Sequence, residues 1–401
     1  MALVVQKFGG TSVKDAERIK NVARIVLEEY KKGNQMVVVV SAQGDTTDDL
    51  IEKAAEITAD PSHRDMDFLL ATGEQIAAAL LAMAIHSMGY RAVPLTGWQA
   101  GFLTNSNHGR ARIRRLSKER LEHELDKKNI VIVTGFQGIN RYDDITTLGR
   151  GGSDTSAVAI AAALKADKCQ IFTDVDGVYT ADPRIVPNAH KLSAISYDEM
   201  LELASLGAQV LHNRSVEMAK KYNVPLEVLS SFEKKPGTIV KEVVPMEKML
   251  IKGVAKDDNV TQISIVGIPD VPGIAFKVFS LIAKAKVNVD IILQSVGRDG
   301  SKDIAFTVAS SDTKAILQLL GENMERLGFK DLSSHEVSKV SVVGAGMESN
   351  PGVAARMFEA LGDANINIHM ISTSEIKISV LIDREFGKKA VIAVHDAFDL
   401  Q

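Results

Sequence analysis

Lys7, Gly9 and Gly10 form the first group of residues that could carry chemistry, in the stretch KFGGTSV between a short apolar strand and a helical pattern. Missing side chains let a ligand approach the backbone, and the first amides of a helix favour an anion. A lysine at the strand end could add a point charge to a phosphoryl group. The stretch predicts a phosphate site, and a tight turn with a solvated lysine is the alternative.

A second glycine-rich turn, GRGGSDTSA, places Arg150 and Gly152 directly before a helix of small and apolar residues. Ser153, Asp154 or Thr155 could simply cap that helix. An arginine fork beside bare backbone amides also suits a carboxylate or a phosphate. Two such turns predict two anionic ligands, one a nucleotide and the other an acceptor.

A third segment, FTDVDGVYTADPRIVP (172–187), follows a strand and lacks helical periodicity, which predicts a loop at the end of that strand. Ligand contacts gather at such loops in open α/β sheets. Its polar side chains are Thr173, Asp174, Asp176, Tyr179, Asp182 and Arg184. The three aspartates could capture a metal ion, but their spacing is not that of an EF-hand, and turn-forming aspartates explain them as well.

Three further polar residues stand out nearer the N-terminus. Ser41 and Thr47, in VVSAQGDTTDDL, follow a strand and offer hydroxyl groups. Glu74 lies in the apolar pattern FLLATGEQIAAALL, where an unpaired carboxylate would be costly, so we expect it to meet an ammonium group or a hydroxyl. No grouping of histidine, cysteine and carboxylate has metal spacing, and no nucleophile elbow occurs, so no protein-held metal site is predicted.

The elements that must position these residues alternate along residues 1–245. The β-rich runs are 3–8, 36–42, 130–136, 170–175 and 226–231, and the helical patterns are 14–32, 48–58, 66–88, 117–128, 153–166 and 207–222. Continuous Val/Ile runs are apolar on both faces, as a central sheet covered by helices requires. The pattern predicts an α/β domain with a central, mostly parallel sheet flanked by helices.

After a turn-rich, charged stretch the sequence repeats itself. Residues 263–292 align with 340–371, with Gly267 matching Gly344 and the Pro272–Gly273 pair matching Pro351–Gly352. Each copy has the pattern strand, helix, strand, strand, helix, strand. We therefore predict two ferredoxin-like α+β modules, at residues 246–333 and 334–401.

Bulk properties limit the class of protein. A chain of 401 residues predicts two or three domains, and a net charge of -4 gives no basic field for nucleic acid. The one cysteine, Cys169, fits a reducing cytoplasm, and the apolar start is too short for a signal peptide. Segment 68–90 is apolar but carries Glu74, Gln75 and His86, so a buried helix is expected rather than a membrane span.

The motifs KFGGTSV, VVSAQGDTTD, GRGGSDTSA and TDVDGVYTADPRIVP, in this order and followed by two tandem modules, resemble the aspartate kinases of the amino-acid kinase superfamily. The resemblance covers essentially the whole chain and implies an amino-acid kinase fold followed by two ACT domains. The resemblance is to the monofunctional aspartate kinases, which lack a homoserine dehydrogenase domain. Acetylglutamate or uridylate kinases would lack the third loop and the paired modules, and a catalytically dead amino-acid sensor would lack Lys7, Arg150 or Asp154.

The resemblance implies transfer of the γ-phosphoryl group of MgATP to the side-chain carboxylate of L-aspartate, the first step towards lysine, threonine and methionine. That acceptor is ionised at neutral pH and needs no general base. The implied catalytic residues are Lys7 and Asp154; substrate is bound by Ser41, Thr47, Glu74, Arg150, Gly152 and Ser153; nucleotide is bound by Lys7, Gly9, Gly10, Thr173, Asp174, Tyr179 and Arg184. Two positions depart from the family pattern: Gln209 stands where a basic residue is usual, and Gln43 where an apolar one is.

ACT modules imply regulation by a bound amino acid, here lysine, threonine or both, and pairing of modules in a homodimer or a larger assembly. Exposed amides at the Pro-Gly turns suit an effector carboxylate, and Asp270 could take its ammonium group. The expected effector residues are Asp270, Gly273, Ala275 and Gln294 in the first module and Ala354, Asn367, Ile368, Ser374 and Glu375 in the second.

Overall fold

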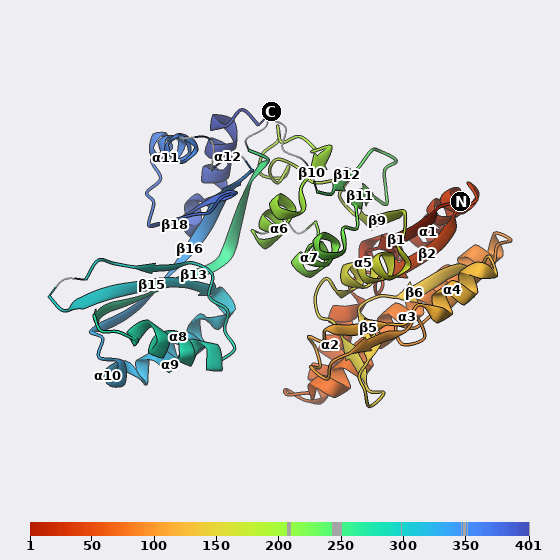
Figure 1. Ribbon diagram of the computed structural model, residues 1–401, viewed down its shortest axis with the longest axis horizontal. Helices are drawn as coiled ribbons and strands as arrows, with labels where there is room; N and C mark the ends of the chain where they lie inside the picture. The colour runs from red at the N-terminus through yellow and green to blue at the C-terminus, as the bar shows by residue number, and fades with distance from the viewer. Residues whose placement is uncertain are drawn as a thin grey trace. The chain divides into compact units, whose positions relative to one another are not determined.

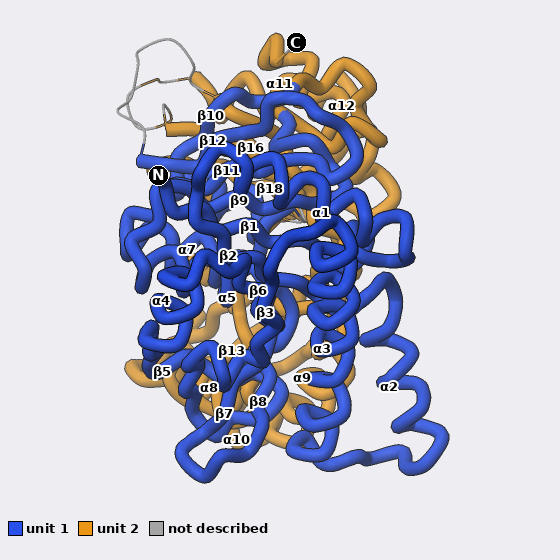
Figure 2. Tube along the Cα trace, turned by 90° about the vertical axis from the view of Figure 1, so that its right-hand side faces the viewer, with its two compact units in different colours: residues 1–179, 191–205, 209–245 blue, residues 180–190, 206–208, 246–401 orange. Residues whose placement is uncertain are grey.

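The computed structural model describes residues 1–206, 210–242, 251–297, 299–345, 347, 350 and 352–400. These residues form two compact units (Figure 2). The first unit contains residues 1–179, 191–205 and the described part of 209–245, and the second contains 180–190, Leu206 and the described residues after 246. The boundary between them therefore divides the third predicted loop after Tyr179.

The first unit is built on an eight-stranded sheet with the order β10-β12-β11-β9-β1-β2-β6-β3 (Figure 1). Its pairs are parallel except β11 with β12. The strands are β1 (Leu3–Phe8), β2 (Gln35–Val40), β3 (Ala92–Leu95), β6 (Ile130–Thr134), β9 (Lys168–Thr173), β10 (Ala194–Ile195), β11 (Leu226–Ser230) and β12 (Thr238–Val240). Every residue of β6 is buried, as the apolar run predicts.

Helices cover both faces of this sheet. Residues of α1 and α3 share one core with Val4, Val38 and Ile132. On the other face, the helix α5 packs against β1, β2 and β9. The helices are α1 (Ala16–Tyr30), α2 (Thr46–Ile57), α3 (His63–Ser87), α4 (Glu119–Asp126), α5 (Gly152–Leu164), α6 (Tyr197–Ser205) and α7 (Asn213–Tyr222), with a 3₁₀ turn η1 (Gly10–Val13). By length and composition α3 could cross a membrane, but it carries Asp67 and Glu74 among its buried residues.

A smaller sheet in the first unit has the order β5-β4-β7-β8. Its strands are β4 (Phe102–Thr104), β5 (Ile113–Leu116), β7 (Gln137–Ile139) and β8 (Ile145–Thr147). The sequence did not predict this sheet, because strands of three or four residues are too short to show a periodic pattern. The helix predicted from 207 begins only at Asn213, and residues 207–209, with Gln209, lie outside the described residues.

The second unit has a six-stranded antiparallel sheet with the order β14-β15-β13-β16-β18-β17. Its strands are β13 (Gly253–Pro269), β14 (Ile292–Gln294), β15 (Ser301–Ala309), β16 (Asp331–Val343), β17 (Met370–Thr373) and β18 (Lys377–Asp383). Its helices and 3₁₀ turns are α8 (Ile274–Lys284), η2 (Ser310–Asp312), α9 (Thr313–Gly321), α10 (Met324–Leu327), α11 (Val353–Asp363), η3 (Arg384–Phe386) and α12 (Gly387–Ala397).

Two long strands, β13 and β16, run through both modules of this unit (Figure 1). A register shift between Asp257 and Val260 divides β13. The part from Val260 pairs with β15 in the first module, and residues 253–257 pair with residues 339–343 in the second. The second module therefore takes a strand from before the first, which differs from the simple tandem arrangement expected at 246–333 and 334–401.

Each module has its own core. Ile263, Val278 and Phe306 belong to the first, and Val340 and Met357 belong to the second. The second core also contains Ala181 and Val186, which are both almost fully buried. These two apolar side chains explain why residues 180–190 belong to the second unit.

Candidate active site

Four parallel strands of the first unit end at one edge of the sheet. Phe8 lies opposite both Val40 and Phe172, and Val40 lies opposite Thr134. The segments that follow β1, β2, β6 and β9 therefore start side by side. Ligands of open α/β sheets bind at this edge.

Lys7 and Asp154 form an ion pair at this edge. The Lys7 Nζ lies 2.7 Å from the Asp154 Oδ1, and each side chain is only 11% exposed. Lys7 comes from β1, and Asp154 comes from the first turn of α5. Because the pair is largely removed from water, the Lys7 ammonium is screened less than that of a surface lysine.

Gly9 and Gly10 serve different purposes. A Cβ at Gly9 would lie 3.6 Å from the Lys7 Nζ, so glycine leaves the space beside the lysine open. The Gly9 N–H donates to the Phe172 carbonyl at 3.2 Å. A Cβ at Gly10 would lie 2.7 Å from the Ala42 carbonyl oxygen, so Gly10 is required by backbone packing. The glycines lead into η1 and not directly into the predicted helix, which begins at Ala16.

The second glycine-rich turn is held by tight packing. Gly151 has φ of +67°, and a Cβ there would come within 2.2 Å of the His212 Cβ. Gly151 is also the N-cap of α5 without any side-chain capping bond, so the capping explanation for Ser153 or Asp154 is wrong. A Cβ at Gly135, after β6, would lie 2.6 Å from the Ser153 Oγ. Ser153 is therefore packed against the strand edge, whereas Arg150 is exposed.

Glu74 is buried on α3, and one of its two carboxylate oxygens has a hydrogen-bond partner. Its Oε1 accepts a hydrogen bond from the Ala42 N–H at 3.1 Å, and its Oε2 has no hydrogen-bond partner among the described residues. Burial raises the pKa of Glu74 to about 7. A buried carboxylate oxygen without a partner suits an incoming ammonium group.

The loop after β2 carries the two predicted hydroxyl residues. The Ser41 N–H donates to the Phe8 carbonyl at 3.1 Å, and Thr47 lies in the first turn of α2. Gln43, which departs from the family pattern, donates from its Nε2 to the Val13 carbonyl at 2.8 Å. The amide side chain thus links this loop to η1.

The loop after β9 consists of local turns. Thr173 donates to Asp174 at 2.9 Å, and the Tyr179 hydroxyl donates to Asp176 at 2.7 Å, which raises the pKa of Tyr179 to about 12. Asp182 pairs with Arg184 at 2.8 Å within the second unit. Each of the three aspartates of this loop thus has a local partner, as the turn-forming alternative requires.

Sequence reasoning missed the residues that hold the second turn in place. Arg214 donates to the carbonyl groups of Leu148 and Ala111 at 2.5 and 3.0 Å, and burial lowers its pKa. Burial also lowers the pKa of His212. The two residues belong to α7 and its N-cap, and LHNR, their local motif, carries no signal that distinguishes it from an ordinary helix start.

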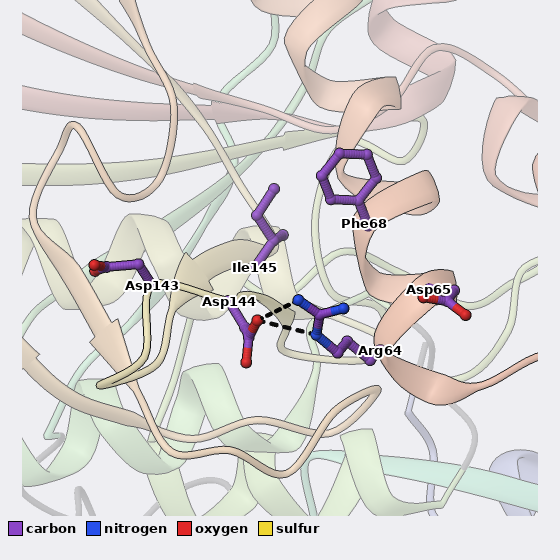
Figure 3. A pocket seen from close by; sticks show the side chains of 6 residues that line it. All are labelled: Arg64, Asp65, Phe68, Asp143, Asp144 and Ile145. Atoms are coloured by element: carbon purple, nitrogen blue, oxygen red, sulfur yellow. Dashed lines mark hydrogen bonds and ion pairs between the residues drawn. The ribbon is translucent and has the colours of Figure 1, made fainter.

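A cavity of about 250 Å³ lies elsewhere, at the N-terminal end of α3 (Figure 3). Arg64 extends over it and donates to Asp144 from two nitrogens, at 2.9 and 2.6 Å. The lining includes Phe68 and Asp143 but none of the predicted site residues. The polar groups at the strand edge, rather than this cavity, define the candidate site.

The predicted effector residues lie in the second unit. Asp270 pairs with Lys302 at 2.8 Å, and Gly273, with φ of +86°, caps α8 with open space around it. Gly352 is the matching cap of α11, while Pro351 lies outside the described residues. The remaining predicted residues are Ala275 on α8, exposed Gln294 on β14, Ala354 on α11, and Asn367, Ile368, Ser374 and Glu375 next to β17.

Family models match three segments of the chain. Residues 2–230 match the amino acid kinase family, and residues 261–322 and 340–398 each match an ACT domain. The molecule is thus of the amino acid kinase class and carries two ACT domains, which confirms the predicted fold.

The relatives narrow the class. The aspartokinase of Mycolicibacterium smegmatis is 53% identical to this chain, and the alignment covers 100% of this chain and 97% of the relative's length. Aspartokinase III of E. coli, solved in complex with aspartate and ADP, superposes with a TM-score of 0.83 at 26% identity, covering 98% and 99% of the two chains. The same enzyme with lysine and aspartate gives a TM-score of 0.76, again at 26% identity, covering 99% of both chains. The chain therefore belongs to the aspartokinase family.

Proposed function

We propose that this aspartokinase transfers the γ-phosphoryl group of MgATP to the side-chain carboxylate of L-aspartate, giving 4-phospho-L-aspartate. The observation that carries the proposal is the buried Lys7–Asp154 pair at the strand edge, with Glu74 and its unpartnered oxygen on the neighbouring helix. A relative solved with aspartate and ADP supports the choice of ligands.

Lys7 is proposed to stabilise the charge that develops on the transferring group, and Asp154 to hold the lysine in place. Phosphoryl transfer depends mainly on positioning and charge neutralisation. Because Gly9 has no side chain, a phosphate oxygen can approach the Lys7 ammonium, so the residues present fit a nucleotide. The first amides of η1 would face the phosphates, because the first amides of a helical turn lack intrahelical partners.

Mg²⁺ is proposed to come with the nucleotide and to neutralise part of its charge. The chain's own residues then bind and orient both ligands. Thr173, Asp174 and Tyr179 follow β9 in the first unit and would contact the nucleotide.

The acceptor is proposed to be held by its two charged groups. Glu74 would receive the ammonium group of aspartate, and Arg150 would bind a carboxylate with two donors. Ser41, Thr47 and the turn at Gly152 and Ser153 would complete the site. The side-chain carboxylate of aspartate is itself the nucleophile and needs no base.

A product assay tests the reaction. The purified protein is incubated with MgATP and L-aspartate, and hydroxylamine traps any acyl phosphate as a hydroxamate. We expect hydroxamate with aspartate and little with glutamate or N-acetylglutamate. ATP hydrolysis without an acyl phosphate would contradict the proposed acceptor.

Regulation is proposed to act through the ACT modules, with lysine, threonine or both as inhibitors, in a homodimer or an assembly built from it. A relative solved with both lysine and aspartate supports binding of an amino acid in addition to the substrate. The single cysteine, buried Cys169, fits the reducing cytoplasm where such a pathway would operate.

A further inference from the structure

A cluster of two histidines and one aspartate lies on the surface of the second unit, among the residues the structure describes. The Nε2 atoms of His335 and His369 each lie 2.9 Å from the Asp383 Oδ1. The two rings meet edge to face, with centroids 5.3 Å apart. One ligand atom from each residue lies within 4.8 Å of the other two.

We propose that His335, His369 and Asp383 form a binding site for a divalent transition metal such as Zn²⁺. Two imidazoles and a carboxylate are a ligand set that Zn²⁺, Co²⁺ and Ni²⁺ accept, whereas Mg²⁺ and Ca²⁺ prefer oxygen ligands. The site is therefore distinct in chemistry from the Mg²⁺ that would accompany a nucleotide.

The two distances from the carboxylate oxygen are close to those that an ion requires. In a tetrahedral zinc site with bonds of about 2.0–2.1 Å, the ligand atoms lie about 3.3 Å apart. Each nitrogen now lies 2.9 Å from the carboxylate oxygen, so a shift of a few tenths of an ångström separates them enough. Each imidazole would present its Nε2 lone pair with its proton on Nδ1, and the metal would replace the two N–H···O contacts.

The backbone positions the three ligands. Asp383 ends β18 and lies opposite Val337 of β16, two residues from His335. His369 directly precedes β17, and its N–H donates to the Leu381 carbonyl of β18 at 2.8 Å. The ligands therefore come from two neighbouring strands of one sheet and from the residue before a third, which limits the conformational entropy that metal binding would cost.

The cluster is open to solvent, so an ion could enter without a conformational change. The side chains of His335, His369 and Asp383 are 56%, 28% and 36% exposed. The neighbouring Arg384 carries a positive charge next to the site, and its ion pair with Glu336 at 2.5 Å compensates part of that charge. Three protein ligands leave a fourth position for water, so the ion would bridge the strands in an open site.

Calorimetry with ZnCl₂ tests the site on the full-length, tag-free protein after treatment with EDTA and dialysis. We expect one zinc ion per chain at this site, and an affinity at least about tenfold lower in His335→Ala, His369→Ala and Asp383→Asn, because each change removes one of three ligands. His123→Ala is the matched control: it removes an exposed histidine from α4 and should leave the affinity unchanged.

A second measurement does not depend on how well the variants fold. Co²⁺ added to the wild-type protein should give visible absorption bands of a nitrogen- and oxygen-ligated, low-coordinate ion, and excess Mg²⁺ should not remove them. Absence of zinc binding, or equal zinc binding in the wild type and the three ligand variants, would overturn the proposal. Neither measurement uses kinase activity.

Discussion

Among the described lysine and arginine ion pairs of the first unit, the Lys7–Asp154 pair has both side chains less exposed than most. Lys118 and Glu122, for example, lie 2.7 Å apart as well, but their side chains are 52% and 46% exposed. Exposed pairs contribute little, because water and salt screen them. Because water screens it less than an exposed lysine, the Lys7 ammonium can interact more strongly with a bound phosphate, and Asp154 offsets part of that attraction.

Lys7→Ala should therefore lower kcat by at least about 100-fold, the scale of losing one preorganised charge contact, with a smaller change in the KM for ATP. Steady-state kinetics with the hydroxamate assay measure this. Lys118→Ala is the control and should retain wild-type kinetics. A Lys7→Ala enzyme with near-wild-type kcat would remove the lysine from the proposed mechanism.

Glu74 gives the site a pH dependence. Its pKa is raised by burial from 4.5 to about 7, so below pH 7 the free enzyme holds it mostly neutral. An ammonium group favours the ionised form, so aspartate must bind with loss of a proton there. We expect the KM for aspartate to rise by up to about tenfold per pH unit as pH falls below 7.

Glu74→Gln should raise the KM for aspartate at pH 8 and remove this dependence. The folded pKa lies above the unfolded value, so the contribution of Glu74 to stability is full below about pH 4.5 and is lost as pH rises through 7. The variant should therefore unfold at a higher urea concentration than the wild type at pH 8.

Glu124→Gln is the control: it changes another buried glutamate and should alter none of the aspartate kinetics. An unchanged pH profile in Glu74→Gln would contradict this role.

At the scale of elements, the turn before α5 positions Ser153 and Asp154. Gly151→Ala should destabilise the protein twice over: a positive φ strains alanine by about 1–2 kcal/mol, and the collision with His212 adds about 1–3 kcal/mol. Gly33→Ala is the control, because Gly33 has φ of +86° and nothing within 4 Å of the added carbon. Denaturant unfolding should show a larger decrease in the free energy of unfolding for Gly151→Ala than for Gly33→Ala. Equal decreases would show that His212 moves away.

The long elements of the first unit follow from the sequence, because continuous apolar runs such as β6 have no alternative to a covered sheet. The meeting of the ends of β1, β2, β6 and β9 follows as well, since parallel strands bring their ends to one side of the sheet. The four short strands of the second sheet have no periodic signal. The strand at residues 253–257 could not be assigned to the second module, because its partners at 339–343 are long-range and the repeat pattern does not include it.

At the scale of the whole molecule, β13 and β16 join the cores of the two ACT modules. Both strands continue from one module into the other, with a register shift in β13 at Asp257. A packed sheet does not deform gradually, so a ligand that favours one arrangement of a module also favours one arrangement of its neighbour. Regulation by an amino acid requires such differential binding.

Inhibition by lysine, threonine or both is the expected outcome of that coupling in the proposed dimer. Gln294, exposed on β14, is expected to contact the effector, so Gln294→Ala should relieve inhibition while kcat without effector stays unchanged. The measurement is kinase activity titrated with lysine, threonine and their mixture, with molar mass determined in parallel by light scattering. Gln318→Ala, which removes an exposed glutamine of α9 in the same unit, should leave inhibition intact. A wild-type enzyme that responds to neither amino acid would show that these modules only assemble the chains. Unchanged inhibition in Gln294→Ala would instead place the effector elsewhere.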